Sequence, residues 1–327
     1  MYDAQEIIDA AKRIENEIYE TPLFENSELN AIVGGRVFLK PECLQRTGSF
    51  KIRGAYNFMS QLSRIEAENG VVAFSSGNHA QGVAMAGKIL KIKTTIVIPQ
   101  DAPESKIANT KKLGGNVVLY DRYKECREKI AKKIAKDTGA ILVPSYDHKD
   151  IIIGQGTVGL EIIQQVRNHS DSLDQVLICC GGGGLSAGSS IAIKDALPET
   201  EIFLVEPRFF NDTKKSFEAG KRIANTPNKQ SICDALLADI PGELTFSINN
   251  KLATNVLMVS DDEVKDAMRF AFQFLKMVVE PGGSVALAAA LSQKIDFENK
   301  VSVVVLSGGN VDMSLYDEIQ REDGSSI

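Results

Sequence analysis

The sequence predicts an α/β protein made of open parallel sheets with flanking helices. The first observation is an alternation of short apolar, strand-like runs with helix-like segments, which is typical of parallel sheets. The second is size, because 327 residues are enough for two domains with substantial cores. The third is composition, since 43% hydrophobic and 24% charged residues are ordinary for a soluble globular protein.

The charge, the apolar runs and the cysteines argue against nucleic-acid-binding, membrane-spanning and disulfide-rich proteins. A formal net charge of −6 without a Lys/Arg-rich stripe argues against a nucleic-acid-binding surface. No apolar run is long enough to cross a bilayer, and residues 1–6 lack the basic and apolar regions of a signal peptide. Five scattered cysteines are more typical of reduced thiols than of a disulfide framework. We therefore expect a cytoplasmic protein without membrane or nucleic-acid partners.

The first 69 residues contain one lysine of interest. Asp3 and Glu6 form a capping-box pattern for a helix that we expect to end near Tyr19. A strand is predicted at residues 36–40 and a helix through residues 56–62. Lys51 would lie in the first turn of that helix, after a Gly48-Ser49 pair that could cap it. A cation is disfavoured at this positive end of the helix dipole, although most lysines are ordinary surface charges.

The alternation becomes regular from residue 70. Strands are predicted at residues 71–75, 94–98, 116–120 and 141–143, with helices ending near residue 89 and at residues 105–113 and 122–137. A long helical stretch at residues 150–166 then breaks the rhythm. We therefore expect a small inserted domain at residues 70–147, and a large domain formed by residues 1–69 together with 148–327.

The alternation restarts beyond the long helix. Strands are predicted at residues 175–180, 201–205, 256–260 and 301–306, and helices at residues 186–196, 262–277 and 284–292. The carboxyl ends of parallel strands build ligand crevices, so the residues that directly follow strands are the candidates for a site.

A run of glycines separates one such strand from its helix. The run is Gly181, Gly182, Gly183 and Gly184, followed by Leu185. Consecutive glycine amides can point into one concavity at the positive end of a helix dipole, which favours an anion and most naturally a phosphate. A tight turn alone would not require four glycines. The run is not a P-loop, because no Gly-Lys-Ser/Thr follows, and its spacing differs from the dinucleotide pattern.

Polar residues also follow the first strand of the inserted domain. Ser75, Ser76, Asn78 and His79 lie there, and Ser or Asn at such a position commonly caps a helix. The same cluster suits a carboxylate or a phenolic oxygen. His79 is more typical of a structural histidine than of a catalyst, and the three histidines show no metal-ligand spacing.

Two further strand ends carry candidates. After the last long strand, the Ser307 hydroxyl can face a ring nitrogen, while Gly308 and Gly309 permit close approach of a flat ligand. A plain turn is the open alternative. Glu206 and Asp212 can supply oxygen ligands to Mg²⁺ or Ca²⁺ with a backbone carbonyl between them, or they are two solvated carboxylates.

Five motifs together resemble the serine/threonine dehydratase and serine racemase family, in order along nearly the whole chain. They are Ser49-Phe50-Lys51-Ile52-Arg53-Gly54-Ala55, Ser75-Ser76-Gly77-Asn78-His79-Ala80-Gln81-Gly82, Gly154-Gln155-Gly156-Thr157, the glycine run with Leu185, and Ser307-Gly308-Gly309-Asn310. This family consists of pyridoxal-phosphate (PLP) enzymes of the tryptophan-synthase-β fold type. The resemblance therefore implies two open parallel-sheet domains with PLP in the cleft between them. The segment Glu280-Pro281-Gly282-Gly283 varies the loop that is usual in the family.

The resemblance also implies roles for single residues. Lys51 would be the Schiff-base lysine, and the phosphate would be bound by Gly181, Gly182, Gly183, Gly184 and Leu185. Phe50 would pack against the pyridine ring, Asn78 would bond its 3′-oxygen and Ser307 would face its nitrogen. The substrate carboxylate would be framed by Ser75, Ser76, Asn78 and His79, with Arg127 near the substrate in racemase-like members. The cation site of the family, for Mg²⁺, Ca²⁺ or Mn²⁺, falls on Glu206, the Phe210 carbonyl and Asp212.

The implied activity is dehydration of a 3-hydroxy amino acid of the L-serine/L-threonine type, which gives a 2-oxo acid and ammonia, in a homodimer. Ser76 keeps alternatives open, because a hydroxyl opposite Lys51 would serve a serine racemase. Racemases and 3-hydroxyaspartate dehydratases of the family carry Ser here, whereas its dedicated threonine dehydratases typically carry Ala.

Two rival hypotheses come from other classes. A nicotinamide oxidoreductase would use the glycine run for a pyrophosphate, and a non-catalytic amino-acid sensor would tolerate the loss of Lys51. The presence of Lys51 argues against the sensor.

Overall fold

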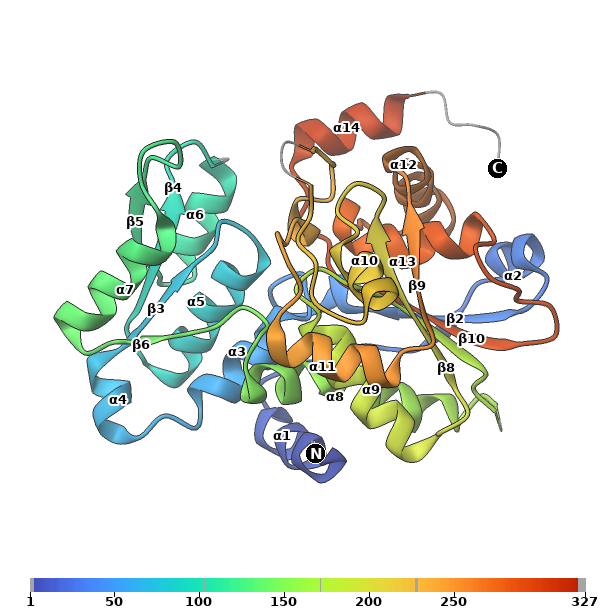
Figure 1. Cartoon of the computed structure of the whole chain (residues 1–327), viewed down its shortest axis with the longest axis horizontal. Helices are drawn as coiled ribbons and strands as arrows, with labels where there is room; N and C mark the ends of the chain where they lie inside the picture. Colours follow the sequence, from blue (N-terminus) through green and yellow to red (C-terminus); the bar gives the residue numbers. More distant parts are fainter. Residues whose placement is uncertain (1–2, 103, 171, 227–228, 323–327) are drawn as a thin grey trace.

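The computed structural model describes residues 3–102, 104–170, 172–226 and 229–322, whose strands form two sheets that Figure 1 shows side by side. The six-stranded sheet has the order β1 (Phe24–Glu25), β2 (Arg36–Pro41), β10 (Val301–Leu306), β7 (Gln175–Cys179), β8 (Glu201–Pro207), β9 (Asn255–Val259). The four-stranded sheet has the order β5 (Asn116–Tyr120), β4 (Thr94–Pro99), β3 (Val71–Phe74), β6 (Ile141–Leu142).

The strand directions confirm the α/β class and add one detail. All neighbouring strands run parallel except β1 and β2, which are antiparallel. The larger sheet is therefore mixed, because its otherwise parallel strands carry one antiparallel strand at this edge. β1 has two residues, and an antiparallel edge strand on an otherwise parallel sheet is common because it needs no crossover helix.

The strand order brings three predicted site segments to one edge. β10 lies between β2 and β7, and all three run in the same direction. The residues that follow β2, β7 and β10 therefore meet at the carboxyl edge of the larger sheet. These segments lead to Lys51, to the glycine run and to Ser307, respectively.

Helices surround both sheets. Those near the larger sheet are α1 (Ala4–Ile14), α2 (Ser27–Val33), α8 (Lys149–Val166), α9 (Gly184–Ala196), α10 (Asp212–Ala219), α11 (Glu243–Leu252), α12 (Asp261–Phe270), α13 (Pro281–Leu291) and α14 (Met313–Arg321). Those near the smaller sheet are α3 (Lys51–Met59), α4 (Arg64–Asn69), α5 (Asn78–Leu90), α6 (Glu104–Lys112) and α7 (Arg127–Thr138). Short helical turns occur at η1 (Glu42–Leu44), η2 (Asp234–Leu236) and the π-helix η3 (Ala271–Leu275).

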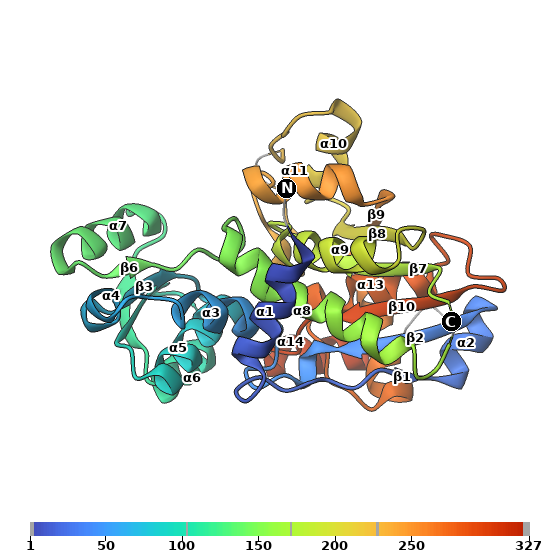
Figure 2. The ribbon, with the colours of Figure 1, turned by 90° about the horizontal axis from the view of Figure 1, so that it is seen from below.

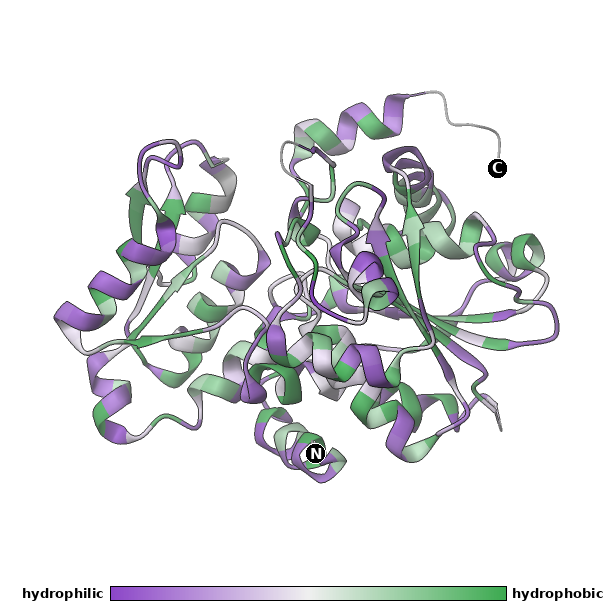
Figure 3. Ribbon diagram, viewed as in Figure 1, coloured by the Kyte–Doolittle hydropathy of each residue, from purple (hydrophilic) through white to green (hydrophobic). Residues whose placement is uncertain are grey.

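The apolar residues form two main cores. One fills the space around the larger sheet, and the other joins β3, β4 and α5 to the apolar side of α3. Figure 3 shows hydrophobic residues along the strands and many hydrophilic ones on the outlying helix α7. Because α3 belongs to the second core, Lys51 at its first residue lies at the boundary of the two parts, as Figure 2 also shows for α3. The predicted domain boundaries at residues 70 and 147 stay a prediction.

Small residues let the central helices approach closely. A Cβ on Gly188 of α9 would lie 2.1 Å from the carbonyl oxygen of Ile152 in α8. A Cβ on Gly156 would likewise lie 2.8 Å from the carbonyl oxygen of Gly188. Since such distances exclude any side chain, Gly156 of the Gly-Gln-Gly motif serves the packing of α8 on α9.

A buried ion network anchors the helix that begins at Lys51. Arg53, which is fully buried, donates to Glu42 at 2.7 and 2.8 Å and to Glu161 at 2.5 and 2.9 Å. Lys40 donates to the same Glu161 at 2.6 Å. A buried charge without its partner costs about 3–5 kcal/mol, so these pairs hold α3 firmly against η1 and α8.

Several predicted helices have different bounds in the structure, and the first of them, α1, ends at Ile14 and not near Tyr19. α9 starts at Gly184, two residues earlier than predicted, so the end of the glycine run is already its first turn. The predicted helix at residues 262–277 is interrupted, because α12 ends at Phe270 and the π-helix η3 follows. Lys276 then adopts a left-handed conformation with φ of 59°, which ends the helical path. Within the described residues, no helix combines the length and the apolar character that a membrane span requires.

Candidate functional site

Lys51 lies at the first residue of α3 with its amine turned inward. Its Nζ donates to the carbonyl oxygen of Ser145 at 3.0 Å and lies 4.9 Å from the centre of the Phe50 ring. Burial lowers the pKa of Lys51 to about 8, while the neighbouring Cys179 and Glu280 act in the opposite direction. A substantial fraction of the amine is therefore neutral near physiological pH, which is the form that attacks carbonyl groups and accepts protons.

The predicted cap of this helix is wrong. The N-cap residue is Phe50 in a helical conformation, without a side-chain cap. The Ser49 hydroxyl is buried and has no hydrogen-bond partner in the described part of the chain. The reason is that the Phe50 amide donates to the Ser307 carbonyl and Ser49 pairs with Gly308, so backbone pairing with the segment after β10 holds Ser49 where the helix begins.

The glycine run forms a tight turn at the start of α9. Gly183 adopts a φ of +87°, which favours glycine, and it provides no side-chain cap for the helix. A Cβ on Gly182 would lie 2.3 Å from ring atoms of Tyr146. A Cβ on Gly184 would lie 2.4 Å from the Gln155 side-chain oxygen. The glycines are therefore required by close neighbours, while the helix amides remain available to an anion.

A second buried polar atom next to this turn has no partner. The Gln155 side-chain oxygen, in α8, accepts no hydrogen bond from the residues that the structure describes. A buried acceptor without a donor costs free energy, and it is a common sign of a bound group or water. The Ser49 hydroxyl and the Gln155 oxygen thus flank Lys51 and the glycine run, respectively, as the polar lining of a ligand site would.

The polar residues after β3 differ in their burial and in their hydrogen bonds. Asn78 begins α5 and is buried, with its amide hydrogen-bonded to Glu280 at 2.5 Å and to Asn310 at 2.7 Å. The Ser75 hydroxyl accepts from the Gly77 amide at 3.2 Å, so this serine supports the turn. Ser76 is half-buried and directly precedes that glycine.

His79 is a buried histidine held by the backbone. Its Nε2 lies 3.1 Å from the carbonyl oxygen of Val143, so this nitrogen is the protonated one in the neutral ring. Burial, with a smaller contribution from the charge of Lys51, lowers the pKa of His79 to about 3. The ring is therefore neutral at physiological pH, in keeping with the structural role expected for it.

Ser307 joins the site at the end of β10. Its carbonyl accepts from the Phe50 amide at 3.2 Å, and its side chain is hydrogen-bonded to Cys179 at the end of β7. Burial raises the pKa of the Cys179 thiol to about 11, so that thiol is neutral. Ser307 thus lies between the Lys51 segment and the strand that leads to the glycine run.

Arg127 lies at the rim. It is the exposed first residue of α7, with its guanidinium 5.6 Å from the centre of the Phe74 ring at the end of β3. Its charge also reaches the Tyr146 hydroxyl, which connects the rim to the ring that covers the glycine run. No hydrogen bond of Arg127 to another predicted site residue is present among the described residues.

Glu206 and Asp212 form a separate pair beyond the glycine run. Glu206 accepts from the amides of Thr213 at 3.0 Å and Lys214 at 2.9 Å, and one Asp212 oxygen accepts from Asn225 at 2.7 Å. The other Asp212 oxygen is buried without a partner in the described chain. Burial raises the pKa of both carboxyls, and Asp212 adds to the effect on Glu206. Phe210 lies between them and is half-buried.

Sequence reasoning missed three contributors. Glu280 is buried and bonded to Asn78, but its segment was noted only as a variation of a loop. Tyr146 and the Ser145 carbonyl lie in the connection between β6 and α8, which carries no motif. Only the position of that connection, between the two predicted domains, could have pointed to it.

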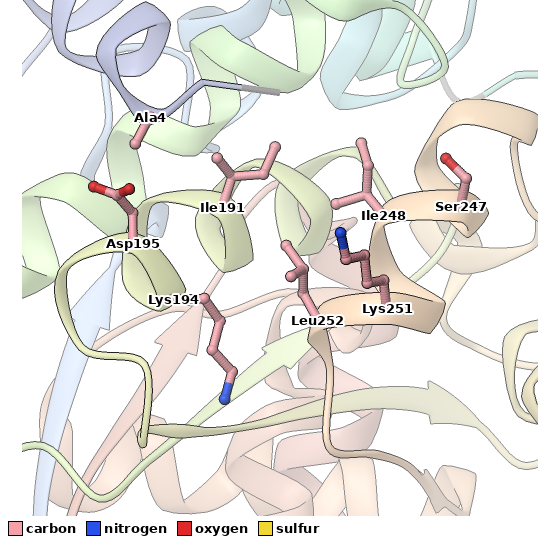
Figure 4. Close-up of a pocket in the computed structure, with 8 residues that line it drawn as sticks. All are labelled: Ala4, Ile191, Lys194, Asp195, Ser247, Ile248, Lys251 and Leu252. Atoms are coloured by element: carbon pink, nitrogen blue, oxygen red, sulfur yellow. The ribbon is translucent and has the colours of Figure 1, made fainter. Parts of the chain in front are cut away.

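A cavity of about 400 Å³ lies elsewhere, between the start of α1 and helices α9 and α11 (Figure 4). It is lined by Ala4, Ile191, Lys194, Asp195, Ser247, Ile248, Lys251 and Leu252. None of the predicted site residues lines it, so this cavity is distinct from the Lys51 site.

Comparisons with known proteins show the family of the chain. Residues 14–308 match the family model described as pyridoxal-phosphate dependent enzyme. The chain belongs to this family. The residues described above fit the cofactor, because a buried amine, a glycine turn at a helix N-terminus and two buried polar atoms without partners lie together at one sheet edge.

The chain is similar over nearly its whole length to family members with different activities. It is 42% identical to an L-threo-3-hydroxyaspartate ammonia-lyase from Pseudomonas sp, over 97% of this chain and 98% of that one. It is 39% identical to an L-threonine ammonia-lyase from Thermotoga maritima, over 98% of this chain and 78% of that one. The structure of maize serine racemase superimposes with a TM-score of 0.91 at 38% identity, covering 97% of this chain and 96% of that one. The chain is thus a PLP-dependent enzyme whose relatives include both ammonia-lyases and racemases.

Proposed function

We propose that this enzyme is an ammonia-lyase that dehydrates a 3-hydroxy amino acid of the L-serine/L-threonine type to a 2-oxo acid and ammonia. The observation that carries the proposal is Lys51, an inward-facing amine with a lowered pKa beside a phosphate-binding type of turn. The family membership and the ammonia-lyases among the relatives support it. The alternative of a non-catalytic sensor is set aside, because the chain belongs to an enzyme family.

The cofactor would be held by residues from several segments. The amides from Gly181 to Leu185 would bind the phosphate, and Phe50 would pack against the ring. Asn78 would donate to the ring oxygen, while Ser307 would face the ring nitrogen as a neutral partner. When bound, pyridoxal phosphate supplies an electron sink for negative charge at the substrate α-carbon.

The chain's own residues would then handle the proton. The neutral amine of Lys51 would remove the α-proton as general base, and burial provides the lowered pKa that this role needs. His79 stays neutral and would frame the substrate carboxylate together with Ser75, Ser76 and Asn78. Loss of the α-proton and the β-hydroxyl amounts to loss of water, and hydrolysis then yields the oxo acid and ammonia.

Serine racemisation is the second candidate, favoured by the Ser76 hydroxyl and by the similarity to maize serine racemase. Racemisation needs a proton donor on the face opposite Lys51, and Ser76 would supply it. With L-serine as substrate, Ser76→Ala should lower D-serine formation about 100-fold or more, the usual size of a general acid–base contribution. Oxo acid formation should change less than about threefold, because the proton removed by Lys51 is on the other face. Equal losses of both products would contradict this role of Ser76.

A 3-hydroxyaspartate substrate is the third candidate, favoured by the similarity to the Pseudomonas ammonia-lyase and by Arg127 at the rim. The guanidinium could pair with the second carboxylate of such a substrate. Arg127→Gln should then lower kcat/KM for 3-hydroxyaspartate about tenfold more than for L-serine. The decisive experiment compares oxo acid release from L-serine, L-threonine and L-threo-3-hydroxyaspartate by the wild-type enzyme. Release from 3-hydroxyaspartate alone would replace the first candidate by this one.

A divalent cation at Glu206, the Phe210 carbonyl and Asp212 is a further proposal. Among the described residues, no group of three or more His, Cys, Asp or Glu side chains could hold a metal ion. The proposed site uses two carboxylates and a carbonyl, and it is supported by the unpartnered Asp212 oxygen and by the raised pKa of both carboxyls. A cation would neutralise their repulsion, and oxygen ligands suit Mg²⁺, Ca²⁺ or Mn²⁺.

A homodimer and a cytoplasmic location complete the proposal. Phe272, Phe274 and Val278 are each nearly half exposed on and after η3, a surface that a second copy could cover. Phe274→Asp should then convert a dimer to a monomer in light scattering after gel filtration. A wild-type protein that is monomeric at micromolar concentration would contradict the dimer. The five cysteines are free, which agrees with a reducing compartment.

A further inference from the structure

Asn78, the residue at the boundary of the two sheets, belongs to a continuous chain of hydrogen bonds. Its Nδ2 donates to Glu280 at 2.5 Å, and its Oδ1 accepts from Asn310 Nδ2 at 2.7 Å. The same Asn310 Nδ2 donates to the Thr47 carbonyl at 2.7 Å. The order is therefore Glu280, Asn78, Asn310, Thr47. Asn78 begins α5 on the side of the smaller sheet, whereas Glu280 and Asn310 flank α13 and β10 on the larger one.

The two ends of this chain determine the orientation of both amides. A backbone carbonyl and a carboxylate accept hydrogen bonds, so Thr47 and Glu280 require donors. Asn310 must then present its NH₂ group to Thr47 and to Asn78, which directs the Asn78 oxygen toward Asn310. The Asn78 NH₂ group is left facing Glu280. It has two N–H groups, and its second one has no acceptor among the described residues.

The surrounding backbone is shaped to admit the Glu280 carboxylate. A Cβ on Gly308 would lie 2.2 Å from Glu280 Oε1, so a side chain at Gly308 would displace the carboxylate. A Cβ on Gly48 would lie 2.6 Å from Asn310 Oδ1, at the other end of the chain. Glu280 is buried at the N-cap position of α13, yet its carboxylate does not cap that helix. An N-cap role therefore does not explain the residue.

We propose that Glu280 is a positioning residue that orients the Asn78 amide and leaves its second N–H for the ring oxygen of the cofactor. Asn310 is the second tether of the same amide. This inference rests on the proposed function, because it takes the site to bind pyridoxal phosphate. It adds a reason for the glycine after Ser307, which makes room for the Glu280 carboxylate.

The test compares Glu280→Ala, Asn310→Ala and Glu280→Gln with the wild-type holoenzyme. An N–H donated to the ring oxygen stabilises its ionised form, so the visible absorbance band of the bound cofactor reports on it. Both alanine variants should raise the pH midpoint of that band by about one unit or more, and weaken pyridoxal phosphate binding about tenfold. Glu280→Gln keeps an acceptor oxygen for Asn78, so the midpoint should stay within about half a pH unit and the affinity within about threefold of wild type.

Ser284→Ala is the matched control. Ser284 is buried in the first turn of α13, and its hydroxyl donates to the backbone carbonyl of Glu280 at 2.9 Å. This variant should leave the absorbance titration unchanged, which separates amide orientation from a general disturbance at the start of α13.

The outcomes distinguish this inference from the proposed function. Unchanged midpoints in Glu280→Ala and Asn310→Ala would overturn the positioning role while leaving the cofactor assignment intact. A loss in Glu280→Gln equal to that in Glu280→Ala would also overturn it, because the acceptor oxygen would then not be what matters. A wild-type enzyme that binds no pyridoxal phosphate would instead overturn the proposed function itself.

Discussion

Replacing Lys51 should stabilise the cofactor-free protein. Burial lowers the pKa of Lys51 from 10.5 to about 8, so the folded state holds the ammonium ion at a disadvantage. A shift of this size corresponds to about 3 kcal/mol, and the partial exposure of the side chain reduces the expected effect to about 2 kcal/mol. Lys51→Met retains the packing of the side chain without the charge. We expect it to unfold at higher urea concentration than wild type at pH 7.

The stability difference between Lys51→Met and wild type should shrink as the pH rises. Because the folded-state pKa is lowered, the folded chain binds fewer protons than the unfolded chain between about pH 8 and pH 10.5. The wild-type disadvantage is therefore complete below pH 8 and fades as the pH approaches 10.5. The stability difference between Lys51→Met and wild type should fall by more than half between pH 7 and pH 9.5.

The assay is urea unfolding of both proteins after removal of pyridoxal phosphate, followed by circular dichroism. Lys40→Met provides the matched control, because Lys40 is a fully buried lysine that is paired with Glu161 at 2.6 Å. Its replacement leaves that carboxylate short of a partner and should destabilise by about 3 kcal/mol. If Lys51→Met were no more stable than wild type at pH 7, or if the difference did not change with pH, the buried-amine argument would be refuted.

Two further predictions follow from the site. Gly182→Ala places a Cβ 2.3 Å from the Tyr146 ring and should weaken pyridoxal phosphate binding about tenfold or more in a fluorescence titration. Adding Tyr146→Ala to the same chain should restore part of the affinity. An unchanged affinity in Gly182→Ala would contradict the close contact. Because the pKa values of Glu206 and Asp212 are raised, the stability of the cation-free protein should fall as the pH rises from about 4 through the raised values. Mg²⁺ or Ca²⁺ should therefore raise the melting temperature more at pH 8.5 than at pH 6, and Asp212→Asn should abolish this effect. An equal rise at both pH values would contradict the prediction.

Patterns that are local in sequence predicted the fold class, and they also led to two site hypotheses. The alternation of strands and helices predicts the α/β class because the sequence pattern of each element lies within about ten residues. The glycine run indicated an anion site because strand, turn and helix start are contiguous. The charge at the start of a helix singled out Lys51, and its inward-facing amine agrees with that emphasis.

Features that depend on distant residues were not predictable. Glu280 contacts Asn78 across 202 positions of sequence, and no spacing rule connects them. Tyr146 is recognised only when its ring is seen against Gly182. The Ser49 cap was a local rule overridden by pairing with Gly308, and the interrupted helix after Phe270 shows the same competition between local propensity and surroundings.

A covalent bond between Lys51 and the cofactor can be detected by chemical reduction. The purified holoenzyme is reduced with borohydride, digested and examined by mass spectrometry, with Lys51→Ala treated in parallel. We expect a pyridoxyl-phosphate adduct on the peptide that contains Lys51, and no adduct in the variant. An adduct on another lysine, or the same visible absorbance band in Lys51→Ala as in wild type, would contradict it.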